Sequence, residues 1–425
     1  MENGNLRMGG SGINYQGRIY TCGKSFAGQA HTVTTDELIE KVSPFFKRMG
    51  LVRFADITGY DRIGIPVVNA VRPFERGMSV SHGKGVDLAA AMASALMESV
   101  ERFCAVTTEL PCVRDSYVLL KKKNNVVPAE LLPLSKHSIF NPDNQELWTT
   151  GWDIVSGQEV MLPYSLVTMN WSDSELDSFF KSSNGLAGSV DFLEAVTQAL
   201  IEVIERDATT NSLLEARCRK SSTLLRRVRP ETIAFDRVNG LTAKIEEVDV
   251  YWVIYDCTID TAVPTYECQL IDLREPDFLL CKGMGASLDV ETAMTRAVTE
   301  AVQARAVVLS GVREAFFASE ILPLRLAGKE NLLQILNDEQ SKDWEWVDAD
   351  RHRSIITTAF EEDIAVCVER LQAVGFHQVI VVDLSPEDYD FHVVRVVVPG
   401  LEGVADLMNY APGRRANAFL RGKRV

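Results

Sequence analysis

DLAAAMASALMESVE, residues 87–101, aligns without gaps with DFLEAVTQALIEVIE (191–205) and DVETAMTRAVTEAVQ (289–303). Each segment opens with Asp, has Ala at its fifth and ninth positions and Glu at its twelfth, and ends with Glu or Gln. Self-similarity of this kind indicates one structural unit that is used repeatedly. The spacing of the apolar residues predicts a helix in each case. The helices are expected over about 87–105, 191–218 and 289–309.

A single helix of this kind has a plain structural explanation. Asp at its start is a good N-cap, Ala residues four apart suit close packing, and glutamates opposite the apolar stripe fit a solvated face. Glu98 and Arg102 would then form an ordinary surface ion pair. Three copies in one register favour convergence instead, because a solvated face gives no reason to repeat glutamate at the same place. The converging carboxylates would be Glu98, Glu101, Glu202, Glu205 and Glu300.

Carboxylates gathered in this way imply bound cations, since so many ionised groups repel one another at close range. Oxygen ligands select Mg²⁺ or Ca²⁺, and Mg²⁺ commonly bridges carboxylates to nucleotide phosphates. A polyanionic ligand would also suit the basic residues of the same helices. These are Arg102, Arg206, Arg296 and Arg305.

A small Gly-bearing loop is expected before each helix, where its backbone N–H groups would face a phosphate. The three loops are SHGKG (81–85), SSNGLAG (182–188) and GMGAS (283–287). None has the spacing of a Walker A sequence. Together, the three loops, the acidic helices and their arginines predict a Mg-nucleotide site.

The composition is that of an ordinary globular protein, with 425 residues, 46% of them hydrophobic and 24% charged. A net charge of −15 argues against a broad electrostatic surface for nucleic acid or anionic membranes. The apolar runs are too short to span a bilayer, and the N-terminal residues lack the pattern of a signal peptide. The eight cysteines are scattered, which gives no zinc-site spacing and fits reduced thiols. We therefore expect a cytoplasmic protein that binds neither nucleic acid nor membranes.

Helical and strand-like stretches alternate throughout, so the predicted fold class is α/β. A first helix is expected after Thr34 or Thr35, with Asp36 and Glu37 in its first turn. Further strands are expected at 248–259 and 265–273, helices near 328–345 and 360–375, and β-rich runs at 377–384 and 391–402.

No Pro- or Ser-rich linker divides the chain. We therefore expect a flexible N-terminal segment over residues 1–20 and a single catalytic unit over 21–425. Within that unit, the ATP-binding core would occupy about 60–310 and a C-terminal section about 320–425.

The repeat also resembles a known family. SALMESVERFCA (94–105), SSNGLAG with the following EAVTQALIEVIERDA (194–208), and RAVTEAVQAR (296–305) are similar to the three ATP-binding motifs of YcaO proteins, in order and in internal spacing. The resemblance extends from about residue 24 to 416. It implies the YcaO-type fold, in which three repeated acidic helices converge on a nucleotide site.

By position, the resemblance assigns roles to particular residues. The Mg²⁺ ligands would be Glu98, Glu101, Glu202, Glu205 and Glu300. Further nucleotide contacts would come from Lys24, Ser94, Glu194, Arg206 and Arg296. The catalytic roles would fall on Glu202, Arg206, Arg296 and Glu300. The chain departs from the family pattern after the second loop, where many relatives have Gly-Asn and this chain has Ser189 and Val190. Val190 supplies no polar contact, so this part of the phosphate site would differ.

The resemblance implies an ATP-dependent enzyme that activates a backbone amide of a peptide or protein by phosphorylating its oxygen. External sulfide would give a thioamide, whereas a Cys, Ser or Thr side chain of the substrate would give an azoline. The chain ends AFLRGKRV, without the Pro-rich tail common in azoline-forming members. YDRIGIPVVNAVRP (60–73) and VVVPGLE (396–402) look more like the YcaO proteins that are encoded with a TfuA partner, which is thought to help deliver sulfur.

Thioamide formation with a TfuA-like partner is therefore the favoured hypothesis, and a homodimer is a further expectation. Two alternatives stay open. One is an azoline-forming cyclodehydratase that acts on a ribosomal peptide. The other is a catalytically inactive scaffold subunit, which the change at Val190 would suit.

Overall fold

The computed structural model describes residues 12–24, 31–73, 79–170, 178–218, 225–274, 280–311, 344–403 and 410–421. The chain divides into two compact units, each assembled from separate parts of the sequence. The first unit comprises Met1–Val42, Val100–Asn211 and Thr357–Val425. The second comprises Ser43–Ser99 and Ser212–Ile356. The expected single catalytic unit over 21–425 stays a prediction.

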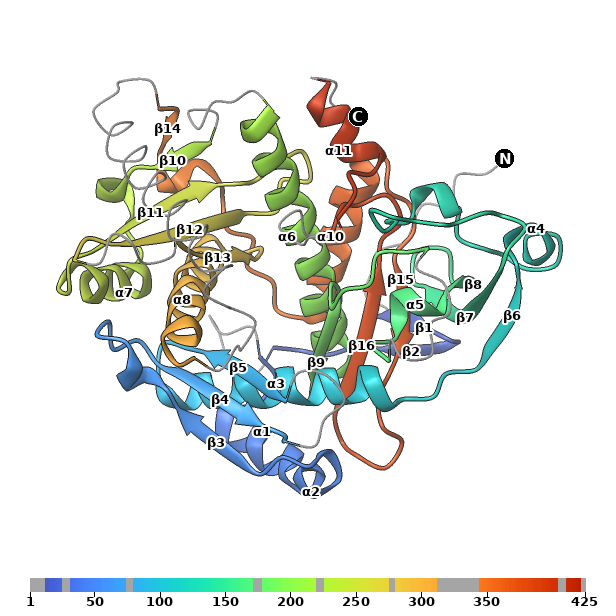
Figure 1. The fold of residues 1–425 in the computed structure, drawn as a ribbon, viewed down its shortest axis with the longest axis horizontal. Helices are drawn as coiled ribbons and strands as arrows, with labels where there is room; N and C mark the ends of the chain where they lie inside the picture. Colours follow the sequence, from blue (N-terminus) through green and yellow to red (C-terminus); the bar gives the residue numbers. More distant parts are fainter. Residues whose placement is uncertain are drawn as a thin grey trace. The chain divides into compact units, whose positions relative to one another are not determined.

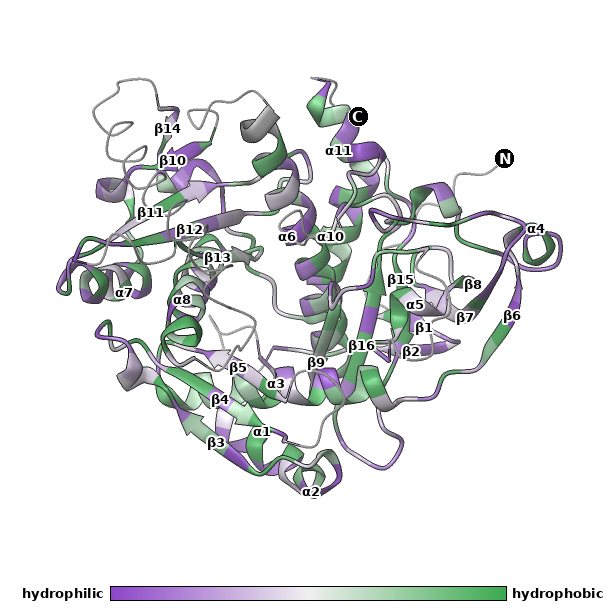
Figure 2. Cartoon of the chain, viewed as in Figure 1, coloured by the Kyte–Doolittle hydropathy of each residue, from purple (hydrophilic) through white to green (hydrophobic). Residues whose placement is uncertain are grey.

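The first unit contains a six-stranded sheet in the order β6-β7-β15-β16-β9, with β8 paired to β7 (Figure 1). All of its strand pairs are antiparallel. The strands are β6 (Cys112–Ser116), β7 (Gln145–Asp153), β8 (Gln158–Pro163), β9 (Leu186–Ser189), β15 (Ile380–Asp383) and β16 (His392–Val397). The helices confined to this unit are α1 (Thr35–Val42), α4 (Tyr117–Leu120), α5 (Tyr164–Val167), α10 (Phe360–Ala373) and α11 (Arg414–Leu420). The runs at 377–384 and 391–402 thus supply β15 and β16, which are mainly hydrophobic (Figure 2).

The second unit contains a three-stranded sheet, β3-β4-β5, and a five-stranded sheet, β13-β12-β11-β10-β14. The strands of the first are β3 (Arg53–Asp56), β4 (Val67–Val71) and β5 (Val80–Lys84). Those of the second are β10 (Arg226–Val228), β11 (Val250–Asp256), β12 (Thr265–Asp272), β13 (Cys281–Ala286) and β14 (Trp346–Val347). Among its described residues, the helices confined to this unit are α2 (Phe46–Met49), α7 (Asp236–Glu246) and α8 (Val290–Leu309). Both α7 and α8 pack on the five-stranded sheet and share one hydrophobic core with it.

Two long helices, α3 (Leu88–Thr107) and α6 (Phe192–Cys218), each contain residues of both units. The mixture of helices and sheets confirms the predicted α/β class. None of the helices among the described residues is both long and apolar enough to span a membrane.

All three helices predicted from the repeat are present, as α3, α6 and α8, and each begins one residue after its aspartate. The aspartates cap the helices as expected. Asp87 Oδ1 accepts a hydrogen bond from the Ala90 N–H at 2.8 Å. Asp191 Oδ1 accepts one from the Glu194 N–H at 3.1 Å, and Asp289 Oδ2 accepts one from the Thr292 N–H at 3.0 Å.

The prediction of Gly-bearing loops was wrong for 81–85 and 283–287, which lie almost wholly in strands β5 and β13. In the second segment, residues 182–185 do form a loop, with Gly185 at positive φ, and 186–188 belong to β9. The glycines are needed for close packing of strand on helix. A Cβ on Gly83 would lie 2.1 Å from the Ala91 carbonyl oxygen, and a Cβ on Gly285 would lie 2.2 Å from the Ala293 oxygen. The repeated alanines of α3 and α8 form the other side of these contacts, since Ala91 and Ala95 meet Gly83 while Ala293 and Ala297 meet Gly285. All six repeated alanines, with Ala195 and Ala199 of α6 included, are fully buried.

Replacement of Gly285 by Ala should destabilise the protein by about 2–3 kcal/mol, because the added methyl group meets backbone atoms that have no room to move. Gly240→Ala is the matched control. Gly240 lies within α7 with no neighbouring atom in reach of a new Cβ, so this change should stabilise the protein by about 0.5–1 kcal/mol. Urea unfolding measures both, and equal stability of the two variants would contradict the packing argument.

Part of the segment that was expected to be flexible, residues 1–20, is regular structure. Residues 13–20 form a hairpin of β1 (Ile13–Tyr15) and β2 (Arg18–Tyr20), while 1–11 lie outside the described residues. The turn places Gln16 and Gly17 at positive φ, as a two-residue hairpin turn requires. The rings of Tyr15 and Tyr20 pack on Phe192 at the start of α6, which anchors the hairpin.

Other local expectations are confirmed. Thr34 caps α1, and its hydroxyl and N–H are both bonded to Glu37, which forms a capping box. The helix predicted at 360–375 is α10. The helix predicted near 328–345 falls almost wholly outside the described residues.

Candidate nucleotide site

The first unit brings together a group of site residues from α3 and α6. Glu101 Oε1 accepts a hydrogen bond from the Gly188 N–H of β9 at 2.8 Å. Arg206 Nε lies 3.7 Å from a carboxylate oxygen of Glu202 and 3.7 Å from one of Glu205. Each of these three carboxylates is therefore held by a backbone N–H group or lies beside an arginine.

The second unit holds Glu98 and Glu300 in equivalent ways. Glu98 Oε2 accepts a hydrogen bond from the His82 N–H of β5 at 2.9 Å, and Glu300 Oε1 accepts one from the Met284 N–H of β13 at 3.4 Å. Each donor precedes its acceptor by 16 residues. The twelfth-position glutamate of a repeat thus binds the strand that leads into its own helix. Glu300 also pairs with Lys84 at the end of β5.

In the first and third repeats, the residue at the fifteenth position behaves differently, because it binds a strand of another repeat. Glu101 on α3 binds β9, and Gln303 on α8 donates to the His82 carbonyl oxygen of β5 at 2.5 Å. The repeated helices are therefore linked to one another's strands within each unit. None of the five glutamates lies on a fully solvated face, since Glu205 is buried and the others are half-buried.

Two further predicted nucleotide contacts, Lys24 and Arg296, are bonded to neighbouring protein groups. Lys24 Nζ lies 2.6 Å from Asp363 Oδ2 and donates to Thr357 Oγ1, also at 2.6 Å. Arg296 Nη1 donates to the Ala286 carbonyl oxygen at 3.2 Å. Ser94 is half-buried on α3, one turn before Glu98.

Glu194 is a buried carboxylate near the start of α6. It accepts hydrogen bonds from His31 Nδ1 at 2.7 Å and from the N–H and hydroxyl of Thr32 at 3.0 and 2.7 Å. Burial by itself would raise the pKa of Glu194, but the bonds from His31 and Thr32 hold that pKa below its ordinary value. Glu194 is therefore a stable anion, whose partners His31 and Thr32 were not found from the sequence.

The donor chemistry of both groups fits a magnesium nucleotide. Carboxylate oxygens are suitable Mg²⁺ ligands, and the cationic Arg206 and Lys84 beside them suit phosphate oxygens. Among the residues that the structure describes, no three His, Cys, Asp or Glu side chains lie close enough together to hold a metal ion. The convergence of all five glutamates on bound cations therefore stays a prediction.

Sequence reasoning also missed Arg395 of β16. This side chain is 1% exposed, and Glu202 and Glu101 both lie near enough to stabilise its charge. The signal was present in the sequence, because a charged residue that interrupts an apolar strand is costly unless its surroundings compensate it.

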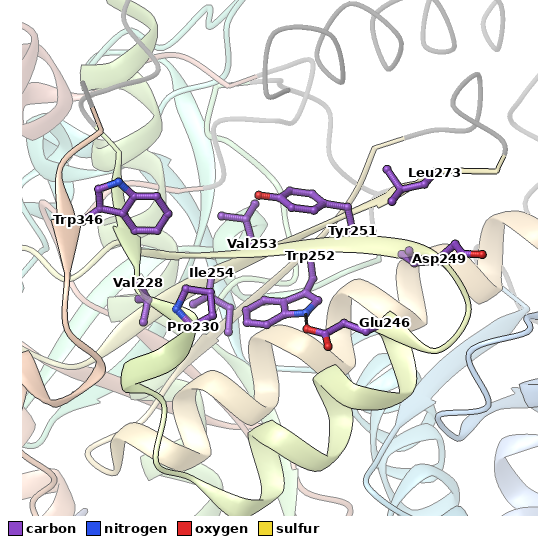
Figure 3. A pocket seen from close by; sticks show the side chains of 11 residues that line it. Val228, Pro230, Glu246, Asp249, Tyr251, Trp252, Val253, Ile254, Leu273 and Trp346 are labelled. Carbon is purple, nitrogen blue, oxygen red and sulfur yellow. Dashed lines mark hydrogen bonds between the residues drawn. The ribbon is translucent and has the colours of Figure 1, made fainter. Parts of the chain in front are cut away.

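A groove in the second unit lies apart from these residues. Its walls are formed by β11 and neighbouring segments, and Trp346 is among its lining residues (Figure 3). Trp252, which also lines it, donates a hydrogen bond to Glu246 Oε1 at 2.8 Å. None of the predicted site residues lines it.

Comparison with known proteins gives a consistent picture. The family model of YcaO cyclodehydratase, described as ATP- and Mg²⁺-binding, matches residues 82–402. An uncharacterized protein of Methanothermobacter thermautotrophicus is 32% identical, over 87% of this chain and 94% of its own. An uncharacterized protein in the tfuA 3′ region of Rhizobium leguminosarum bv. trifolii is 28% identical, over 99% of this chain and 97% of its own.

Two solved structures share the fold. A heterocyclase in complex with substrate and cofactor superposes with a TM-score of 0.77 at 20% identity and covers 96% of this chain, which spans 57% of the length of that chain. YcaO from Methanopyrus kandleri, bound with AMPPCP and Mg²⁺, superposes with a TM-score of 0.66 at 25% identity, over 90% of this chain and 97% of its own.

Proposed function

Because the chain belongs to the YcaO family, with ATP and Mg²⁺ as its cofactors, we propose that it activates a peptide backbone amide and converts it to a thioamide. The activation of the amide by ATP would be the step that thioamide and azoline formation share, and the use of external sulfur would be specific to thioamide formation. The observation that carries the specific step is the similarity, along almost the whole chain, to a protein encoded beside tfuA.

The proposed site uses the residues of the repeat. Glu98, Glu101, Glu202, Glu205 and Glu300 would ligate Mg²⁺. Arg206 and Arg296 would contact the phosphates, and Lys24, Ser94 and Glu194 would complete the nucleotide contacts. In support, Glu202 and Glu205 share Arg206 as a neighbour, and Glu300 pairs with Lys84. Basic side chains thus lie beside the carboxylates, which suits a ligand that contains both Mg²⁺ and phosphate oxygens.

The chemistry needs little covalent help from the protein. Sulfide adds to the amide carbon, and the amide oxygen takes the γ-phosphoryl group of ATP, with ADP as the leaving group. Phosphate then leaves with that oxygen, the S–H proton is lost, and a C=S bond remains. Bound Mg²⁺ would neutralise phosphate charge, while the role of Glu202, Arg206, Arg296 and Glu300 would be to orient the triphosphate and hold its leaving group.

The proposal includes a partner, a TfuA-like protein that delivers sulfur, and a homodimer as the working form. The relative in the tfuA 3′ region supports the partner. A peptide or protein substrate is supported by the heterocyclase structure, which contains a substrate. It is also supported by a solved E. coli microcin synthetase complex with pro-MccB17 bound, which superposes with a TM-score of 0.58 at 13% identity, over 81% of this chain and 87% of its own.

Azoline formation is the second candidate, because the matching family model is described as a cyclodehydratase. In that reaction the nucleophile would be a side chain of a ribosomally made peptide. The inactive scaffold is the weaker alternative. It rests on Val190, which lies half-buried between β9 and α6.

Mass spectrometry separates these candidates. An extract of source cells that lack this gene would supply unmodified substrate, to which the purified chain, its TfuA-like partner, Mg-ATP and sulfide are added. Thioamide formation should give a gain of about 16 mass units at one backbone position, whereas azoline formation gives a loss of about 18. Omission of ATP is the control. Loss of water without incorporation of isotopically labelled sulfur would overturn the thioamide proposal.

A further inference from the structure

Arg395 has unusual surroundings for a buried cation. Its Nε donates to the Val167 carbonyl oxygen at 3.2 Å and its Nη1 to the Asn184 carbonyl oxygen at 2.8 Å. Its Nη2 is buried and has no hydrogen-bond partner among the described residues. A guanidinium buried against carbonyl groups alone is expensive, so this charge requires compensation from its wider surroundings.

The strand that carries Arg395 runs next to the segments that hold the first-unit group. In the β16–β9 pair it stands opposite Leu186, two residues before the Gly188 that donates to Glu101. A Cβ on Gly185 would lie 2.2 Å from the Val396 oxygen and 2.7 Å from Val203 Cγ2. Val396, which follows Arg395, is therefore close to Val203, which follows Glu202.

The electrostatics agree with this geometry. Burial lowers the pKa of Arg395 to about 10, while Glu202 and Glu101 act in the opposite direction and favour its charged form. The guanidinium stays protonated at neutral pH, within electrostatic reach of two of the glutamates proposed to ligate Mg²⁺.

We propose that Arg395 is a positioning residue of the nucleotide site, which supplies a fixed positive charge behind Glu101 and Glu202 and tethers the segment 182–185 through the Asn184 carbonyl. The proposal rests on the Mg-nucleotide site proposed above. Its charge offsets the mutual repulsion of the two carboxylates and raises the local potential for a polyanion.

A fixed charge has a consequence that a merely structural arginine does not share. It repels free Mg²⁺ and attracts a Mg-nucleotide, whose net charge is negative. Its removal should therefore strengthen the binding of Mg²⁺ alone and weaken the binding of Mg-AMPPCP, each by roughly three- to tenfold. A variant that only loosened the fold would weaken both.

Isothermal titration calorimetry with Mg²⁺ alone and with Mg-AMPPCP tests this on the full chain. Arg395→Gln removes the charge and keeps a hydrogen-bond donor, Arg395→Met removes both, and Arg395→Lys keeps the charge. The two neutral variants should show the opposed shifts, and the Lys variant should bind both ligands as the wild type does.

Arg227→Met is the matched control. Arg227 is a fully buried strand arginine of the second unit, stacked on Trp344 with 4.2 Å between the guanidinium carbon and the ring centroid. This variant should lose thermal stability and keep both affinities.

Changes of both affinities in one direction, or of neither, in a folded neutral variant would overturn the role of Arg395. If neither neutral variant folds, the Lys variant decides, since a folded Arg395→Lys protein that loses tenfold in Mg-AMPPCP affinity contradicts a role for the charge. A wild-type chain that binds neither ligand would instead overturn the proposed function itself.

Discussion

Glu202→Gln should lower ATP turnover by about a thousandfold and change the free energy of unfolding by less than about 1 kcal/mol. The amide has nearly the volume of the carboxylate but lacks the charge that a Mg²⁺ ligand needs. Glu202 is half-buried and lies beside Arg206, so the substitution leaves no cavity and one weakened ion pair. Phosphate release measures turnover, and urea unfolding measures stability.

Glu246→Gln is the control for this prediction. Glu246 also lies on a helix and accepts a hydrogen bond, from Trp252, but it belongs to α7 and lies outside the proposed site. This variant should keep wild-type turnover. Unchanged affinity of Glu202→Gln for Mg-AMPPCP would count decisively against the ligand set proposed from the repeat.

Arg415→Met should destabilise the protein by about 3–5 kcal/mol, because it leaves a buried carboxylate without its cation. Asp207 is fully buried, and Arg415 Nε lies 3.0 and 2.9 Å from its two oxygens. Burial raises the pKa of Asp207 to about 6, although Arg415 and the Glu402 N–H favour the ionised form. At pH 8 the carboxylate is therefore ionised and depends on Arg415.

This pair ties the C-terminal helix α11 to α6. Glu402 strengthens the connection, since its carboxylate accepts hydrogen bonds from the Tyr410 hydroxyl at 2.7 Å and from the Ala416 N–H at 2.8 Å. Loss of Arg415 should therefore loosen α11 as well as lower the global stability.

A double-mutant cycle in urea at pH 8 checks the assignment. Asp207→Asn combined with Arg415→Met should recover part of the stability lost in the arginine variant, because no unpaired charge is then buried. Arg421→Met, an exposed change at the end of the same helix, should cost less than about 0.5 kcal/mol. A loss below 1 kcal/mol for Arg415→Met would show that the pair contributes little.

The α/β class, the three helices and their aspartate caps could be predicted because they depend on local patterns. Periodic apolar residues, a capping aspartate and buried alanines act within one or two helical turns. The Gly-bearing segments were misread for a related reason. A glycine that permits a turn and a glycine that permits close packing look alike in sequence, and only the position of Ala91 over Gly83 separates them.

By itself the sequence determined the repeat, and with it three related helices, their start points and the acidic positions proposed for the site, since each is encoded by residues close together in the chain. Only the tertiary structure decided what those residues contact. Glu101 meets Gly188 across 87 residues, Gln303 meets His82 across 221, and Arg395 reaches Asn184 across 211. No local pattern encodes such partners, because strand pairing and helix packing bring them together only when the whole unit has folded.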